Sequence, residues 1–262
     1  MWGQLSACSL LPTWMRPPSH DTTQVHAVHA AHETTADAAR PAGPPTVIEQ
    51  LPVRFTAADK SRWEKVMLPG KTATRYAVAN IENPSASTSL QADSQASASF
   101  LRQRMHIAPE RLRHLRFSWR VEQLIEGADM GRADKEDSPV RIVLAFDGDK
   151  SRWSARTHML NELARALTGE DMPYATLMYV WSNHRPAESV IHNPRTDRVR
   201  KIVMQSGPEG LKRWHRYERD IRADYRHAFG EDPGTLLGVA LMTDTDNTRT
   251  QTRAWYGPIA FD

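Results

Sequence analysis

Three oxygen-bearing side chains lie within four residues near the end of the chain: Asp244, Asp246 and Asn247. Calcium takes about six to eight oxygen ligands, so this trio could begin a structural calcium site. The loop lacks the glycine and the distal glutamate of an EF-hand. Asp and Asn also satisfy the backbone of their own loop, and turn chemistry is the favoured interpretation. The sequence therefore leaves a turn and a structural calcium as alternatives.

A second acidic pair, Asp147 and Asp149, follows a strongly apolar stretch and so marks the end of a predicted strand. Glycoside hydrolysis needs two carboxyl groups about 5 to 10 Å apart across a cleft. Asp147, Asp149, Asp244 and Asp246 could supply such a pair if the two loops meet in space. Taken alone, the Asp147 loop reads as a turn.

A third acidic loop, with Asp134, Glu136 and Asp137, precedes the same strand and is expected to be solvated.

Four aromatic residues lie closest to these loops: Trp153, Trp181, Trp255 and Tyr256. Sugar rings stack on exposed aromatic faces, so these residues are the candidate ligand-binding surface. The competing interpretation places Trp181 and Trp255 in the core, where large aromatic rings usually lie.

Other chemistries find little support. There is no Gly-x-Ser-x-Gly elbow, P-loop or dinucleotide fingerprint. The net charge is only +3, and the densest group of arginines, between Arg213 and Arg226, alternates with acidic residues. This pattern is typical of a solvated surface and argues against a nucleic acid partner.

The N-terminal stretch Leu5-Ser6-Ala7-Cys8 resembles a lipobox, in which Cys8 would be the lipidated residue. The basic and apolar parts of a signal peptide do not precede it, so either the start of the sequence is missing or wrongly placed, or the match is a chance one in a low-complexity tail. Residues 1–45 are rich in Pro, Ala and His and are predicted to be a disordered tail. Export to the periplasm, or anchoring at the outer membrane, is the expected location.

The rest of the chain, residues 46–262, reads as one domain built mainly of strands. Alternating or continuous apolar runs predict strands at residues 117–121, 140–146, 174–181, 199–204, 236–242 and 253–261, with weaker ones at 73–80 and 87–100. Because no regular βαβ alternation appears, we expect a mainly β fold, an antiparallel β-sandwich of the jelly-roll kind.

Two helices interrupt the strands. Ser154 and Gly169 bound the first, whose apolar residues repeat at helical spacing. The second is predicted from the stripe Trp214, Tyr217, Ile221, Tyr225, Ala228 and Phe229, which ends at Gly230 and Pro233.

Several stretches resemble the bacterial family catalogued as domain of unknown function 3047. They are LRFSWRV at 115–121, IVLAFDGD at 142–149, PYATLMYVW at 173–181, VALMTDTDNT at 239–248 and Ala254-Trp255-Tyr256-Gly257. The resemblance runs from about Thr46 to the C-terminus and implies an exported protein with a sugar-binding, galactose-binding-like type of jelly roll. Pro258 departs from the acidic residue expected after the last motif.

Three functional hypotheses follow. The leading one is an exported, non-catalytic domain that binds a glycan or another envelope component. The alternatives are a hydrolase acting on an envelope polysaccharide through paired Asp residues, and a structural or partner-binding envelope protein. Structural calcium is the one cofactor considered, and membrane contact is expected only through the lipid anchor.

Overall fold

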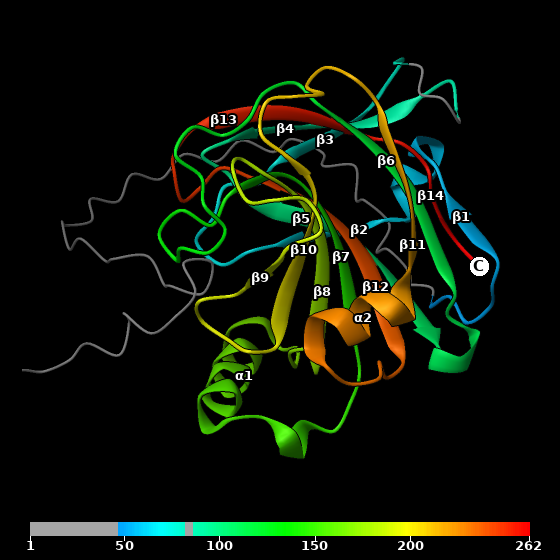
Figure 1. The fold of residues 1–262 in the computed structure, drawn as a ribbon, viewed down its shortest axis with the longest axis vertical. Helices are drawn as coiled ribbons and strands as arrows, with labels where there is room; N and C mark the ends of the chain where they lie inside the picture. The colour runs from blue at the N-terminus through cyan, green and yellow to red at the C-terminus, as the bar shows by residue number, and fades with distance from the viewer. Residues whose placement is uncertain (1–46, 82–85) are drawn as a thin grey trace, which may run out of the picture.

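Two seven-stranded sheets form the body of the protein (Figure 1). The structure is a computed structural model, and it describes residues 47–81 and 86–262. The predicted fold class, a mainly β antiparallel sandwich with two α-helices, is confirmed. Cys8 and the predicted tail lie outside the described residues.

The first sheet contains, in spatial order, β1 (Val53–Phe55), β14 (Ile259–Phe261), β6 (His114–Val121), β13 (Gln251–Tyr256), β4 (Ser89–Gln95) and β3 (Arg75–Ala79), and β11 (His215–Asp220) also pairs with β6. The second contains β2 (Glu64–Met67), β5 (Ser99–Ile107), β12 (Leu236–Asp244), β7 (Ser138–Phe146), β8 (Ala175–Ser182), β10 (Val199–Ser206) and β9 (Val190–His192). Pairing is antiparallel between these strands except for β8 and β10, which run parallel.

Alternation along the strands decides which side chains enter the core. In β7, Val140, Ile142, Leu144 and Phe146 are fully buried, as the period of two predicts. Arg141 lies on the opposite face of that strand. The two sheets meet through aromatic rings: Phe117 of β6 stacks on Tyr179 of β8 at 5.4 Å between ring centroids.

Helix α1 (Ala155–Thr168) begins and ends where the sequence predicted. The Ser154 side chain accepts a hydrogen bond from Thr157 N, and Gly169 closes the helix in the left-handed conformation, with φ of 75°. None of the described helices has the length and apolar character needed to cross a membrane.

Helix α2 (Ile221–Phe229) is shorter than predicted. Trp214 and Tyr217 precede it, and Tyr217 belongs to β11, which pairs with β6 over six residues. The helical prediction for residues 214–220 is therefore wrong. Asp220 marks the change, because its side chain accepts a hydrogen bond from Ala223 N and caps α2.

Short 3-10 helices occupy three connections: η3 (Ala57–Arg62), η4 (Pro109–Arg111) and η5 (Lys150–Arg152). The first and last described strands are neighbours, since Val53 of β1 pairs with Phe261 of β14. Chain segments from both ends of the domain thus lie in one sheet.

Candidate functional site

The two predicted Asp loops lie at opposite ends of β7. In the pairing of β12 with β7, Asp244 lies opposite Ser138, while Leu236 lies opposite Phe146, just before Asp147. The strand between them spans roughly 25 Å at about 3.3 Å per residue. A catalytic pair made from both loops is therefore wrong. Asp147 and Asp149 are exposed, and Asp149 serves as a turn residue that accepts hydrogen bonds from Ser151.

The predicted aromatic binding surface is also wrong. Trp153, Trp181, Trp255 and Tyr256 are all buried, with at most 6% of each residue exposed. Trp181 donates its indole N–H to the carbonyl of Gly207 at 3.0 Å, inside the protein. These rings fill the interior, where their large apolar area stabilises the fold more than it would at a surface.

Asp244 is buried against an arginine. Its two carboxylate oxygens accept hydrogen bonds from Arg141 Nε at 3.0 Å and Nη2 at 2.7 Å, and Oδ1 also accepts from Ser138 N at 3.2 Å. Burial raises the pKa of Asp244 above its usual range, Asp137 and Asp246 add to the rise, and Arg141 opposes it. The Asp244 side chain is only 5% exposed and is held as part of the interior.

The neighbouring carboxylates have other partners. Asp246 forms an ion pair with Lys71 at 2.5 Å. Asp137 accepts hydrogen bonds from Asn247 N at 3.1 Å and from Thr248 N at 2.7 Å. The backbone of the Asp244 loop is thus stabilised by a residue more than a hundred positions earlier in the chain.

The expected solvation of the acidic loop before β7 is wrong for two of its three members. Asp137 is buried, and Glu136 pairs with Lys201 at 2.8 Å and with Arg195 at 2.5 Å. Only Asp134 is exposed, where it pairs with Arg132.

Lys201 is completely buried and donates a second hydrogen bond to Met130 O at 3.0 Å. Burial lowers the pKa of Lys201, while the Glu136 carboxylate opposes that shift. The pKa of Glu136 is lowered, because Lys201 and its neighbours outweigh burial.

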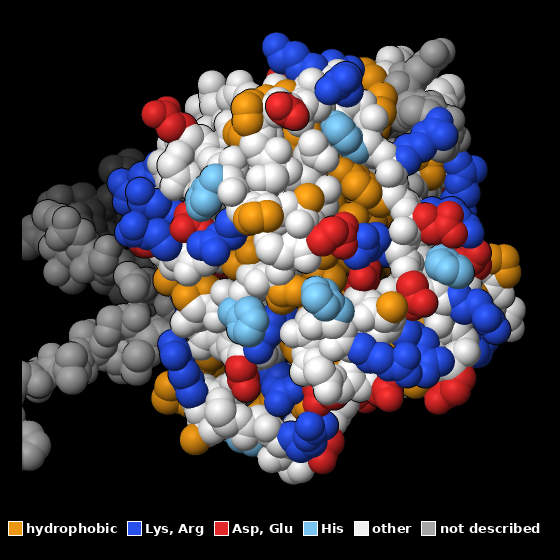
Figure 2. All heavy atoms as spheres, viewed as in Figure 1, with side chains coloured by type: hydrophobic (Ala, Val, Ile, Leu, Met, Phe, Trp, Pro, Cys, Tyr) orange, Lys and Arg blue, Asp and Glu red, His pale blue; other side chains and the backbone are white. Residues whose placement is uncertain are grey.

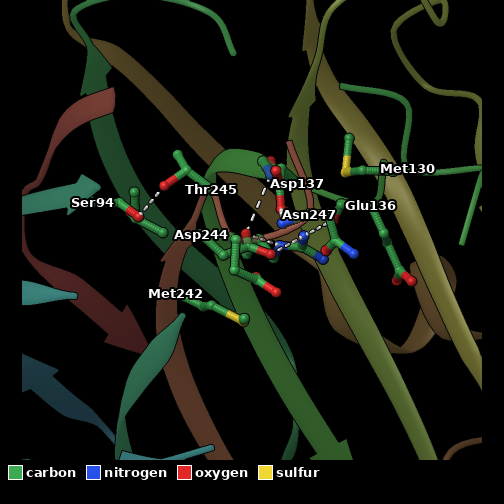
Figure 3. A network of polar contacts seen from close by, with 12 residues as sticks. Ser94, Met130, Glu136, Asp137, Met242, Asp244, Thr245 and Asn247 are labelled. Atoms are coloured by element: carbon green, nitrogen blue, oxygen red, sulfur yellow. Dashed lines mark hydrogen bonds and ion pairs between the residues drawn. The ribbon is translucent and has the colours of Figure 1, made fainter. Parts of the chain in front are cut away.

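These contacts join into one buried cluster of charges, which we call the charge network (Figure 3). Its acidic members are Glu136, Asp137, Asp244 and Asp246, and its basic members are Lys71, Arg141, Arg195 and Lys201. Four formal negative charges meet four positive ones, so the network is balanced within the protein.

Three carboxylates of the charge network are the candidate ligands of the predicted calcium. One oxygen each of Asp137, Asp244 and Asp246 lie within 4.8 Å of one another, a spacing that a metal ion could bridge. Each of these carboxylates, however, already accepts hydrogen bonds from a cation or from backbone N–H groups. A divalent ion would add two positive charges to a balanced cluster. The residues therefore do not fit calcium while Lys71 and Arg141 keep their places.

A separate opening lies between η4, the start of β6 and the N-terminal end of α2. This hollow of about 410 Å³ is lined by Glu110, Leu112, Arg113, His114, Asp220, Arg222 and Arg226. We call it the arginine hollow. Ile221 N donates to Arg113 O at 3.0 Å, which fixes the two sides relative to each other. Figure 2 shows Lys and Arg side chains gathered over the region of α2.

Comparisons with known proteins identify the family but no activity. A family model described as protein of unknown function (DUF3047) matches residues 61–260. The chain belongs to this family. The predicted resemblance is thereby confirmed. No curated protein matches the chain significantly.

Several solved structures show a partial likeness. A xyloglucanase domain from Sinorhizobium fredii has 8% identity and a TM-score of 0.39, over 76% of this chain and 93% of that one. A cellulase derived from an enzyme of Rhodothermus marinus has 11% identity and a TM-score of 0.37, over 80% and 100%.

The glycoside hydrolase domain of Endo-D from Streptococcus pneumoniae has 8% identity and a TM-score of 0.33, over 77% of this chain and 22% of that one. From likenesses of this degree we draw no conclusion about ligand or reaction.

Within this DUF3047 domain, sequence reasoning missed the basic half of the charge network. Arg141 interrupts an otherwise apolar strand, and Lys201 stands in another. A charged residue inside a run that must be buried is itself a signal, because it requires a partner. The arginine hollow gave no such signal, since its residues come from segments more than a hundred positions apart.

Proposed function

We propose that this protein binds a glycan or another envelope component without catalysis, and that the arginine hollow is its binding site. The observation that carries the proposal is the lining of the hollow. Six of its seven residues have side chains that can form hydrogen bonds, as binding of a polar, hydroxyl-rich ligand requires. The predicted aromatic platform and the paired Asp loops cannot serve, because the first is buried and the second lie far apart.

Export and lipid anchoring through Cys8 remain part of this proposal. They would bring the hollow into contact with envelope polysaccharides. Structural calcium is left out, because the charge network is already balanced by its own cations.

A hydrolase is the second candidate, on one specific observation. Two carboxyl residues, Glu110 and Asp220, line the same hollow and could face a bound sugar from two sides. Asp220 is already engaged as the cap of α2. Binding without turnover is therefore the function that the geometry supports better.

The test is a glycan-array screen of the full-length protein, followed by titration of any glycan that binds. The same glycans are incubated with the protein, and released reducing ends are measured. We expect binding that weakens in Arg222→Gln and persists in Arg216→Gln, an exposed arginine of β11 outside the lining.

If the protein releases reducing ends and Glu110→Gln abolishes the release, the protein is a hydrolase and not a non-catalytic binding protein. An array without any bound glycan would overturn the proposed function.

A further inference from the structure

The arginine hollow contains two guanidinium groups without a carboxylate partner. Arg226 beside them pairs with Asp232 at 2.5 Å, and Arg219 pairs with Asp224 at 2.7 Å. Within residues 47–81 and 86–262, Arg113 and Arg222 make no such ion pair. Two arginines of one hollow are thus left with free charge.

Arg222 also has an unsatisfied donor in its guanidinium group. Its Nε is buried and has no hydrogen-bond partner among the described residues. A buried donor without an acceptor is unfavourable. Guanidinium groups pair best with planar or tetrahedral oxyanions, which can accept two parallel hydrogen bonds.

The N-terminal end of α2 adds to the same preference. The helix has nine residues and starts at Ile221, directly beside Arg222. Its first backbone N–H groups carry partial positive charge at this end of the helix, where Asp220 and Arg222 line the hollow. The Asp220 side chain satisfies one of them, Ala223 N at 2.9 Å.

The two carboxylates of the lining limit the class of ligand. Glu110 is exposed, and Asp220 uses one oxygen for the helix cap, so both retain oxygens that can accept from hydroxyl groups. A uniformly anionic polymer would be repelled by them. A ligand with hydroxyl groups and one anionic substituent satisfies both kinds of lining residue.

We infer that the arginine hollow binds an acidic saccharide, with Arg113 and Arg222 receiving the anionic substituent and Glu110 and Asp220 receiving hydroxyl groups. This inference rests on the proposed function and narrows its ligand class. The anionic group is a carboxylate, as in a uronate, or a phosphate ester, since either accepts from guanidinium groups.

The experiment titrates the full-length protein with three saccharides of equal length: a neutral one, one containing a uronate and one carrying a phosphate ester. Inorganic phosphate alone is a fourth arm. Arg113→Gln and Arg222→Gln are compared with Arg216→Gln, and circular dichroism confirms that each variant is folded.

We expect at least one acidic saccharide to bind about tenfold more tightly than the neutral one, a ratio that corresponds to about one charge-assisted contact. Arg113→Gln and Arg222→Gln should each lose about tenfold for that ligand and less than twofold for the neutral one. Added salt should weaken only the acidic ligand. The arm that responds identifies uronate or phosphate.

Equal affinity for neutral and acidic saccharides, unchanged in both variants, would overturn the inference and leave the proposed function standing. Binding of inorganic phosphate without binding of any saccharide would keep the anion site formed by the arginines. It would overturn both the inference that the ligand is a saccharide and the proposed function.

Discussion

Lys201 is the most deeply buried charged residue in the part of the chain that the structure describes. Its ammonium group depends on Glu136 at 2.8 Å and on the carbonyl of Met130 at 3.0 Å. A buried pair need not stabilise a fold by itself, yet removing one partner leaves the other charge without compensation. The charge network should therefore be sensitive to any change that alters its balance.

Replacing the ammonium group while keeping its volume tests this. We expect Lys201→Met to lower the free energy of unfolding by about 3 kcal/mol, the lower end of the cost of breaking a buried ion pair, because Glu136 keeps its burial and is left with Arg195 as its ion-pair partner. Urea denaturation at pH 7 measures it. Lys212→Met, at an exposed lysine, is the matched control. A loss below about 1 kcal/mol, similar to that of the control, would show that Arg195 alone compensates the buried Glu136 carboxylate.

Lys71 gives a prediction about metal binding. Its ammonium group pairs with Asp246, one of the carboxylates that a divalent cation would have to bind. We expect millimolar calcium to leave the melting temperature of the natural protein unchanged and to raise that of Lys71→Met, in which three carboxylates face only Arg141 nearby. Lys65→Met, on the exposed side of β2, is the control. Calcium binding to the natural protein, measured by calorimetry, would contradict this.

At the scale of single residues, the sequence predicted the acidic half of the charge network. Asp244 and Asp246 were singled out, and their loop is a turn in which backbone N–H groups are capped by Asp137. Their partners Arg141 and Lys71 are separated from them by more than a hundred positions. Only the register of β12 against β7 brings Asp244 to Arg141, and local spacing carries no information about that register.

At the scale of the elements, Glu170 connects the C-terminal end of α1 to the second sheet. Glu170 pairs with Arg102 at 2.6 Å and with Arg104 at 2.7 Å, and both arginines belong to β5. Hydrogen bonding from Arg102 lowers the pKa of Glu170 to about 2. These contacts bring the C-terminal end of α1 to β5.

A pH series measures this contact. Because the folded pKa lies below the unfolded value of about 4.5, Glu170 stabilises the fold fully above pH 4.5 and loses its effect as pH falls toward 2. The side chain is 46% exposed, so solvent limits the effect to about 1 kcal/mol or less.

We expect Glu170→Gln to be less stable than the natural protein at pH 7, with the difference shrinking between pH 4.5 and 2. Urea denaturation at several pH values follows it, with Glu162→Gln on the exposed face of α1 as control. If the difference in the free energy of unfolding stays constant with pH, it does not arise from the charge of the Glu170 carboxylate.

The bounds of an element were predicted well where capping residues end it, and poorly where pairing with a distant strand decides between helix and strand. Ser154 and Gly169 bound α1 as expected. The stripe from Trp214 to Phe229 has helical spacing throughout, yet its first part pairs with β6 because a neighbouring strand was available there. Spacing alone does not distinguish these outcomes, and Asp220 as a helix cap was the local signal for the true start.

For the whole molecule, the pairing of the first and last described strands matters most. Phe261 is buried and pairs both with Val53 of β1 and with Leu115 of β6. The core cluster includes residues from both sheets and from α2. The domain should therefore unfold as one cooperative unit.

We expect Phe261→Ala to lower the free energy of unfolding by about 3 to 5 kcal/mol through loss of buried aromatic area. Tryptophan fluorescence and far-UV circular dichroism should shift to the same lower midpoint, because both sheets share the core to which Phe261 belongs. Val78→Ala, at a half-exposed position of β3, is the control. Separate midpoints for the two probes would show that the sheets unfold independently.

The pairing of β1 with β14 also determines how the domain responds to mechanical load. Val53 and Phe261 are partners in an antiparallel ladder, so the described chain enters and leaves this sheet at one end of the same two strands. A force that pulls these two points apart acts on the ladder's hydrogen bonds one after another, from Val53 toward Phe55, and never on all of them together. In a single-molecule pulling experiment the domain should therefore open at low force, by peeling of this ladder. Attachment points at opposite ends of β7 and β12 would load that longer ladder in shear, and the domain should then resist a much higher force.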